Sequence, residues 1–226
     1  MSGSNSVGTF FDRAATVLLV VAALTLSIVA ITDRLQGEPK PPSRVSVEEQ
    51  WQSYIDTARL AAGNQTRVVV NVFSDYQCRF CKTLDDQLES ARAALGDDVE
   101  VQFRHFPLPR HAAAKPAAIA AVCAAEMGAG PEMHRVLFRH QDSLGSLEWD
   151  ELARRSGVTD IARFASCLSA DATAAQVDAD IAAGQRLAIS GTPTFLVNQY
   201  RVTGVMTREE LLDLVAKARS DAGRDR

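Results

Sequence analysis

Two cysteines separated by two residues, Cys78 and Cys81, are the side chains of this sequence best suited to chemistry. They follow an apolar, β-branched run over 68–73 and precede a stretch, 84–95, whose apolar residues recur mostly three or four positions apart. This pattern predicts a buried strand that passes into a helix, with Cys78 at the helix start. The free N–H groups and the positive dipole end of a helix start favour a thiolate there. We therefore expect Cys78 to be the attacking sulfur and Cys81, one turn further, to resolve mixed disulfides.

The same Cys-x-x-Cys spacing occurs in zinc sites, which need two further ligands close together. The other two cysteines, at positions 123 and 167, do not form a second close pair. The four histidines are spread along the chain, and only His134 and His140 fall in one expected helix, six positions apart and so not on one face. We therefore predict no metal site and interpret each histidine as a hydrogen-bonded or solvent-facing residue.

A second unusual feature is the Thr-Pro step at Thr192 and Pro193, which leads directly into an apolar run. Proline cannot donate to a central strand ladder, so such a step is rare before a strand. Together with Phe-Ser-Asp-Tyr-Gln-Cys-x-Phe-Cys over 73–81 and Arg-His-Phe-Pro-Leu over 104–108, this Gly-Thr-Pro-Thr-Phe segment resembles the thioredoxin superfamily and, within it, the DsbA-like disulfide oxidoreductases. The likeness covers roughly residues 64–219.

The resemblance implies an α/β, thioredoxin-like fold with an all-helical insertion packed over the active site. It also implies that Thr192 and Pro193 form a cis-proline loop, which faces the cysteine pair and lines a groove for peptide substrates. Many members carry proline or histidine between the cysteines, where this chain has Arg79 and Phe80. Because that dipeptide helps to set the redox potential in the family, we expect both residues to tune the Cys78 thiolate.

Asp75 lies in the turn three residues before Cys78. Its carboxylate could relay protons during thiol–disulfide exchange. It could equally hydrogen-bond its own backbone, as turn residues often do. Both interpretations stay open at this point.

Cys123 and Cys167 fall in expected helices, each flanked by alanine or leucine. They could be two inert buried thiols. In an oxidising compartment, two buried cysteines in one small helical block more often pair, and relatives of this type commonly carry such a second bridge. We therefore expect a structural disulfide between them.

An uncharged apolar run over 14–31 stands out in the N-terminal region. A helix of that length would rise about 27 Å, close to the roughly 30 Å hydrocarbon core of a bilayer. We expect a short tail over 1–13, a transmembrane anchor over 14–32 and a proline-rich linker over 33–46. The nearest small-residue cleavage site, at 28–30, carries a bulky isoleucine, which favours an uncleaved anchor over a cleaved signal.

The remaining chain is expected to form one domain over 47–220, with the helical insertion at about 110–189 and a solvated tail over 221–226. Charged residues make up 23% of the 226 residues, the net charge is −4, and there is no basic run, so the composition argues against nucleic-acid binding.

The sequence thus predicts a single-pass protein of the cell membrane whose catalytic domain lies outside the cytosol, because a stable disulfide donor belongs there. It would donate disulfides to unfolded or reduced secreted or membrane proteins, with the Cys78–Cys81 disulfide in place of a cofactor. By resemblance, a quinone-linked membrane oxidoreductase would re-oxidise it. The alternatives are a reductase or isomerase of the same fold, and a non-catalytic peptide-binding or holdase module, which would have no use for the cysteine pair.

Overall fold

The structure of the protein is a computed structural model that describes residues 44–54 and 68–224. The predicted tail over 1–13, the anchor over 14–32 and the linker up to residue 43 lie outside the described residues. Among the residues that are described, no helix is long and apolar enough to cross a membrane.

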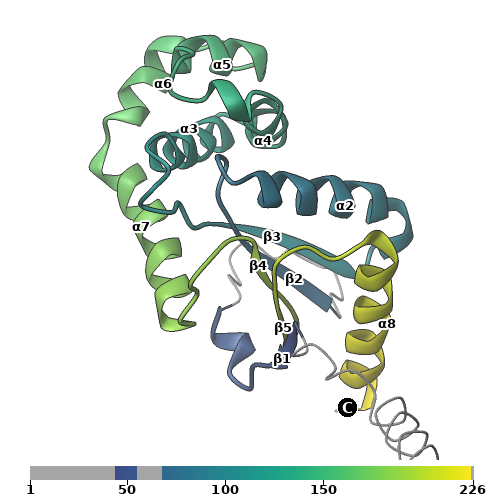
Figure 1. The fold of residues 1–226 in the computed structure, drawn as a ribbon. Helices are drawn as coiled ribbons and strands as arrows, with labels where there is room; N and C mark the ends of the chain where they lie inside the picture. The colour runs from purple at the N-terminus through teal and green to yellow at the C-terminus, as the bar shows by residue number, and fades with distance from the viewer. Residues whose placement is uncertain (1–43, 55–67, 225–226) are drawn as a thin grey trace, which may run out of the picture. The chain divides into compact units, whose positions relative to one another are not determined.

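A five-stranded mixed sheet organises the described domain (Figure 1). In spatial order its strands are β1 (Val45–Val47), β5 (Tyr200–Thr203), β4 (Thr194–Val197), β2 (Val68–Ser74) and β3 (Val99–His105). Strands β2 and β3 are parallel, and the other pairs are antiparallel. All seven residues of β2 are buried, which explains why its sequence is mostly apolar and does not alternate between apolar and polar residues.

Helices cover both faces of this sheet. On one face, apolar residues of β2, β4 and β5 pack against α2 (Arg79–Leu95) and α8 (Arg208–Arg224). On the other face, Phe73 and Leu196 pack with residues of α7 (Asp171–Arg186) and with Tyr54 of a short 3-10 helix, Trp51–Tyr54. The cysteine pair therefore begins a helix that is anchored on the sheet along its length.

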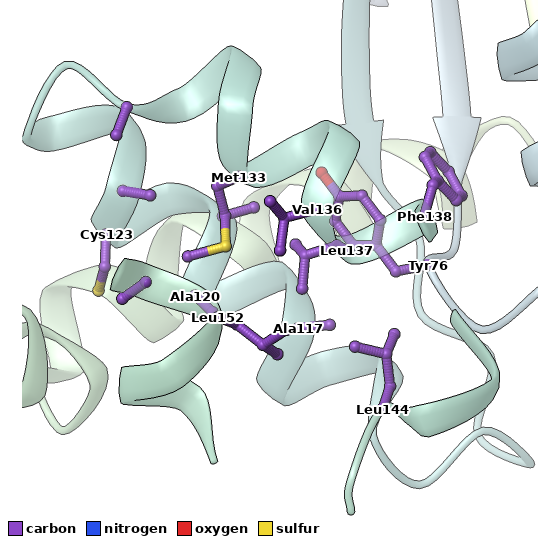
Figure 2. Packing of buried hydrophobic residues seen from close by; sticks show 14 of the residues in the cluster. Tyr76, Ala117, Ala120, Cys123, Met133, Val136, Leu137, Phe138, Leu144 and Leu152 are labelled. Carbon is purple, nitrogen blue, oxygen red and sulfur yellow. The ribbon is translucent and has the colours of Figure 1, made fainter. Parts of the chain in front are cut away.

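The all-helical insertion lies between β3 and β4, as expected. It comprises α3 (Ala114–Glu126), α4 (Gly130–Arg139), the short η3 (Gln141–Ser143), α5 (Trp149–Arg155), α6 (Ile161–Leu168) and α7. Its core gathers around Met133, Leu137 and Leu152 (Figure 2). Tyr76, from the turn before Cys78, belongs to the same cluster, so this turn packs directly against the insertion.

Two expected boundaries differ in the structure. The end of the expected linker, residues 45–46, belongs to β1, which pairs with β5. Helix α8 continues to Arg224, four residues into the expected tail. Asp221 explains this extension, because it accepts a hydrogen bond from the Tyr200 hydroxyl and lies 3.5 Å from the Lys217 ammonium group.

Cys123 of α3 and Cys167 of α6 form a disulfide in the structure, 44 positions apart in sequence. For a closed loop of this length, the chain-entropy model gives a stabilisation of about 4 kcal/mol, and measured values are usually lower. We expect the double variant Cys123→Ala/Cys167→Ala to lose about 2–4 kcal/mol of unfolding free energy. Urea denaturation, with the Cys78–Cys81 pair oxidised in both proteins, measures the difference. Equal midpoints and slopes would show that the bridge does not stabilise the fold.

Candidate active site

The cysteine pair lies where β2 passes into α2. Strand β2 ends at Ser74, a three-residue turn follows, and Cys78 is the N-cap residue of α2 with extended backbone angles (φ −83°, ψ 113°). Its carbonyl accepts the Cys81 N–H at 2.9 Å, which closes the first helical turn. Cys78 therefore lies at the end of the helix where N–H groups are unpaired and the dipole is positive.

The loop at Thr192 and Pro193 lies against the attacking sulfur. The peptide bond between these two residues is cis. Cys78 Sγ lies 3.3 Å from the Thr192 carbonyl oxygen, which accepts from the sulfur when Cys78 is protonated. The sheet register explains this meeting: Phe73 of β2 pairs with Thr194 of β4, so the residues just before Thr194 lie beside those just after Phe73.

The two sulfurs have opposite acid–base character. Cys78 and Cys81 are free thiols in the structure. The hydrogen bond from the Cys81 thiol is the main reason why the pKa of Cys78 falls to about 5, against the opposing effect of burial. The pKa of Cys78 is lowered further by the side chain of Thr192 and by the backbone N–H groups of Cys81 and Phe80. Burial raises the pKa of Cys81 far above its ordinary value, and the hydrogen bond to Cys78 adds to this effect. Near neutral pH the first sulfur is a thiolate and the second a thiol.

Arg79 and Phe80 form the rim beside Cys78. The Phe80 side chain is 51% exposed, which is unusual for so large an apolar group. The Arg79 guanidinium lies over its ring, 4.8 Å from the centroid, at a distance typical of a cation–π contact. The residues between the cysteines thus present an apolar and cationic surface next to the thiolate.

Asp75 is fully buried, and its carboxylate is engaged by the surrounding loops. Oδ1 accepts the Gln77 N–H at 2.7 Å, while Oδ2 accepts the Leu108 N–H at 2.8 Å and lies 2.7 Å from His111 Nδ1. The backbone N–H of Asp75 donates to Cys81 Sγ at 3.4 Å. The bond to Gln77 is the local turn hydrogen bond that was one of the two interpretations of Asp75 from the sequence. The contacts with Leu108 and His111 hold the loop after β3 against the turn that precedes Cys78.

A hydrogen-bonded chain that the sequence did not reveal joins Tyr76, His134 and Asp85. The Tyr76 hydroxyl is 3.0 Å from His134 Nδ1, and His134 Nε2 is 2.8 Å from Asp85 Oδ1. Burial, and secondly the charge of Asp85, raise the pKa of Tyr76, so its hydroxyl keeps its proton. The sequence offered one signal: Asp85 follows Cys81 by four residues, the spacing of neighbours on one helix face.

Metal ligands are not clustered in the described part of the chain. Among residues 44–54 and 68–224, no group of three His, Cys, Asp or Glu side chains is placed to hold a metal ion. The chemistry that the site offers is that of two sulfurs of unequal acidity beside a cis-proline loop.

The five-stranded sheet, the cysteine pair at the start of α2 and the cis-proline loop beside Cys78 make up a thioredoxin-like fold. Residues 57–217 match the protein family described as Thioredoxin, and the chain belongs to that family. The predicted thioredoxin-like α/β fold is thus confirmed.

Solved structures with this fold cover most of the chain. ScsC of Proteus mirabilis in a transitional conformation is 19% identical with a TM-score of 0.65, covering 96% of this chain and 100% of that one. A thioredoxin-like oxidoreductase from Silicibacter pomeroyi DSS-3 is 24% identical with a TM-score of 0.60, covering 69% of this chain and 88% of that one. DsbA of Xylella fastidiosa is 24% identical with a TM-score of 0.55, covering 73% and 89%.

Curated relatives carry a different name. A protein called Na(+)/H(+) antiporter NhaA 3, from Salinispora tropica, is 34% identical over 180 residues, which cover 75% of this chain and 27% of that protein. Na(+)/H(+) antiporter NhaA 1 of Mycobacterium sp. (strain KMS) is 29% identical over 198 residues, covering 85% of this chain and 32% of the relative. The chain therefore spans about a quarter to a third of the length of these relatives.

Proposed function

We propose that this protein is an extracytoplasmic thiol–disulfide oxidoreductase that donates disulfides to secreted or membrane proteins through Cys78 and Cys81. The observation that supports this proposal best is the position of the two sulfurs: Cys78 is the N-cap residue of α2 beside the Thr192–Pro193 loop, and Cys81 is buried one turn further along the helix. A Cys78 thiolate beside the cis-proline loop can attack or be attacked at physiological pH. A buried, protonated Cys81 is held in reserve to resolve the mixed disulfide.

The proposed direction of disulfide transfer, from this protein to its substrate, rests on the redox state in which the Cys78 thiolate exists. The interactions that stabilise the Cys78 thiolate are available only in the reduced protein, because the disulfide carries no charge. They therefore favour the reduced form and make the disulfide a ready donor. A stabilised Cys78 thiolate thus favours an oxidant over a reductase or an isomerase of the same fold.

Membrane attachment, protein substrates and a re-oxidation partner complete the proposed function. We infer that the segment over 14–32 attaches the protein to the cell membrane, with the catalytic domain on the extracytoplasmic side. Its substrates would be unfolded or reduced proteins, and a quinone-linked membrane oxidoreductase would restore the disulfide. No further cofactor is required, because the pair itself accepts and donates the two electrons.

The test is the reduction potential of the pair together with turnover. We expect equilibration of the full-length chain with glutathione to give a potential less negative than roughly −200 mV, and the oxidised protein to introduce disulfides into a reduced, unfolded protein. A potential near −270 mV, the range of thioredoxin, would favour the reductase. Binding of unfolded protein without any exchange would favour the holdase.

A further inference from the structure

A cavity of about 700 Å³ connects the buried cysteine to the chain of Tyr76, His134 and Asp85. Its lining comes from β2, α2, the loop after α2, β3 and one residue of α4, and it includes Cys81, Asp85 and His134. Asp85 lies one helical turn after Cys81, and residues spaced this way have Cβ atoms about 5–6 Å apart. The side chain of Asp85 is 27% exposed, so its carboxylate meets both the cavity and solvent.

The hydrogen-bond chain has only one consistent proton arrangement when His134 is neutral. The carboxylate of Asp85 can only accept, so Nε2 of His134 carries the ring proton. Nδ1 then accepts from the Tyr76 hydroxyl. Phe103 and Phe138 fix the imidazole from two sides, with ring centroids 4.7 and 5.0 Å away. Asp85 is thereby held in one orientation beside the cavity.

Cys81 needs a partner that can take and return a proton. Its thiol is 1% exposed, and it must lose a proton before it can attack a mixed disulfide at Cys78. Asp75 is a poor candidate, because its carboxylate already accepts from two backbone N–H groups and contacts His111, and its side chain is wholly buried. Glu89 also lines the cavity, but it is a further turn away and pairs with Arg92 at 2.8 Å.

We propose that Asp85 is the proton acceptor and donor for Cys81, through water that enters this cavity, and that His134 and Tyr76 are positioning residues that orient it. In the resolving step the Cys81 proton passes to the Asp85 carboxylate, and the Cys81 thiolate attacks Cys78 Sγ. The bond between Cys78 and the partner sulfur breaks, and the partner leaves as a thiolate. When a substrate thiolate opens the Cys78–Cys81 disulfide, the resolving step runs in reverse: Asp85 takes a proton from solvent through the cavity and gives it to Cys81 as that sulfur leaves.

This inference rests on the proposed function, in which Cys78 attacks and Cys81 resolves, and its test separates these two steps. The reduced full-length chain reacts with 5,5′-dithiobis(2-nitrobenzoate) and releases two coloured thiolates. The first release reports attack by Cys78, and the second reports resolution by Cys81. For Asp85→Asn we expect an unchanged first phase and a second phase slowed roughly 100-fold, the lower end of what a general base contributes.

Control variants distinguish a structural effect of the Asp85 substitution on the second-phase rate from a catalytic one. In Asp85→Asn the new amide oxygen would still accept the hydrogen bond from His134, and the unchanged first phase checks that the site is intact. Asp86→Asn is the matched control, since Asp86 is exposed and pairs with Lys82 at 2.8 Å; both phases should keep their wild-type rates. Asp85→Glu should recover most of the second-phase rate, and added formate should accelerate the second phase of Asp85→Ala in proportion to its concentration. His134→Phe, which removes the donor to Asp85, should slow the second phase less than Asp85→Asn does.

Failure of the Asp85 assignment and failure of the proposed function would give different results. A second phase of wild-type rate in Asp85→Asn, or no response of Asp85→Ala to formate, would overturn the assignment of Asp85. A wild-type second phase in His134→Phe would overturn the positioning role. If the wild-type chain shows both phases but oxidises no protein substrate, the proposed function fails and the role of Asp85 stands.

Discussion

Replacing Cys78 by serine should abolish thiol–disulfide exchange, while replacing Cys81 by serine should leave attack intact and trap mixed disulfides. Cys78 is the sulfur with the lowered pKa, beside Thr192 and the cis-proline loop, and so it is the one that meets substrate. In Cys81→Ser the thiol that releases the substrate is absent, and a substrate bound to Cys78 stays bound. We expect turnover to fall by at least about 1,000-fold in both variants, because neither can complete the cycle.

The two variants are told apart by their products. Non-reducing electrophoresis and mass spectrometry of the full-length chain, incubated with a protein disulfide substrate, should find adducts in Cys81→Ser and none in Cys78→Ser. The Cys123→Ala/Cys167→Ala variant is the control, and it should keep exchange activity at temperatures where it is folded, because that bridge joins α3 to α6 within the insertion. Adducts formed through Cys81 in Cys78→Ser, with activity retained, would reverse the assigned roles.

The central part of the site could be predicted because local sequence signals encode it. The apolar run of β2 and the helical spacing after Cys81 placed Cys78 at a helix start, where the structure has it as the N-cap residue. The Thr-Pro step before an apolar strand marked an unusual loop, and the resemblance to the thioredoxin superfamily placed this loop opposite Cys78, where the structure has it. These signals are short-range, since each depends on a few consecutive residues.

The parts that sequence reasoning missed depend on packing between distant segments. His134 is a hydrogen-bonded residue, as predicted, but its partners Tyr76 and Asp85 lie 58 and 49 positions away in sequence. His111 contacts Asp75 from 36 positions away, which only the loop after β3 makes possible. The periodicity of the sequence does not indicate that α4 lies beside α2, so the hydrogen-bond partners of an isolated histidine cannot be predicted from it. The membrane segment over 14–32 remains a prediction, because it lies outside the described residues.

The reduced protein should gain stability relative to the oxidised protein as pH rises from 4.5 to 8. The pKa of Cys78 is about 5 in the folded chain, and near 8.5 for an unperturbed cysteine. A lowered folded pKa contributes stability that is fully present above the unfolded value and is lost as pH falls through the folded value. The window is therefore about pH 8.5 down to 5. Cys81 has a raised pKa and is protonated in both states below pH 8, so it adds no pH dependence there.

The expected size is about 2 kcal/mol between pH 8 and pH 4.5, roughly half of the full conversion of the pKa shift, because solvent screens charge at a helix terminus. Urea denaturation of both redox forms at several pH values measures it. The oxidised form has no Cys78 thiolate, so the pH dependence of its unfolding free energy is the reference. Reduced Cys78→Ser also lacks this thiolate and should show the same pH dependence as the oxidised form. Such behaviour is opposite to that of an ordinary structural disulfide, which stabilises the oxidised form. An oxidised form that is clearly the more stable at pH 7, by a margin that does not change on acidification, would contradict the thiolate argument and favour a reductase.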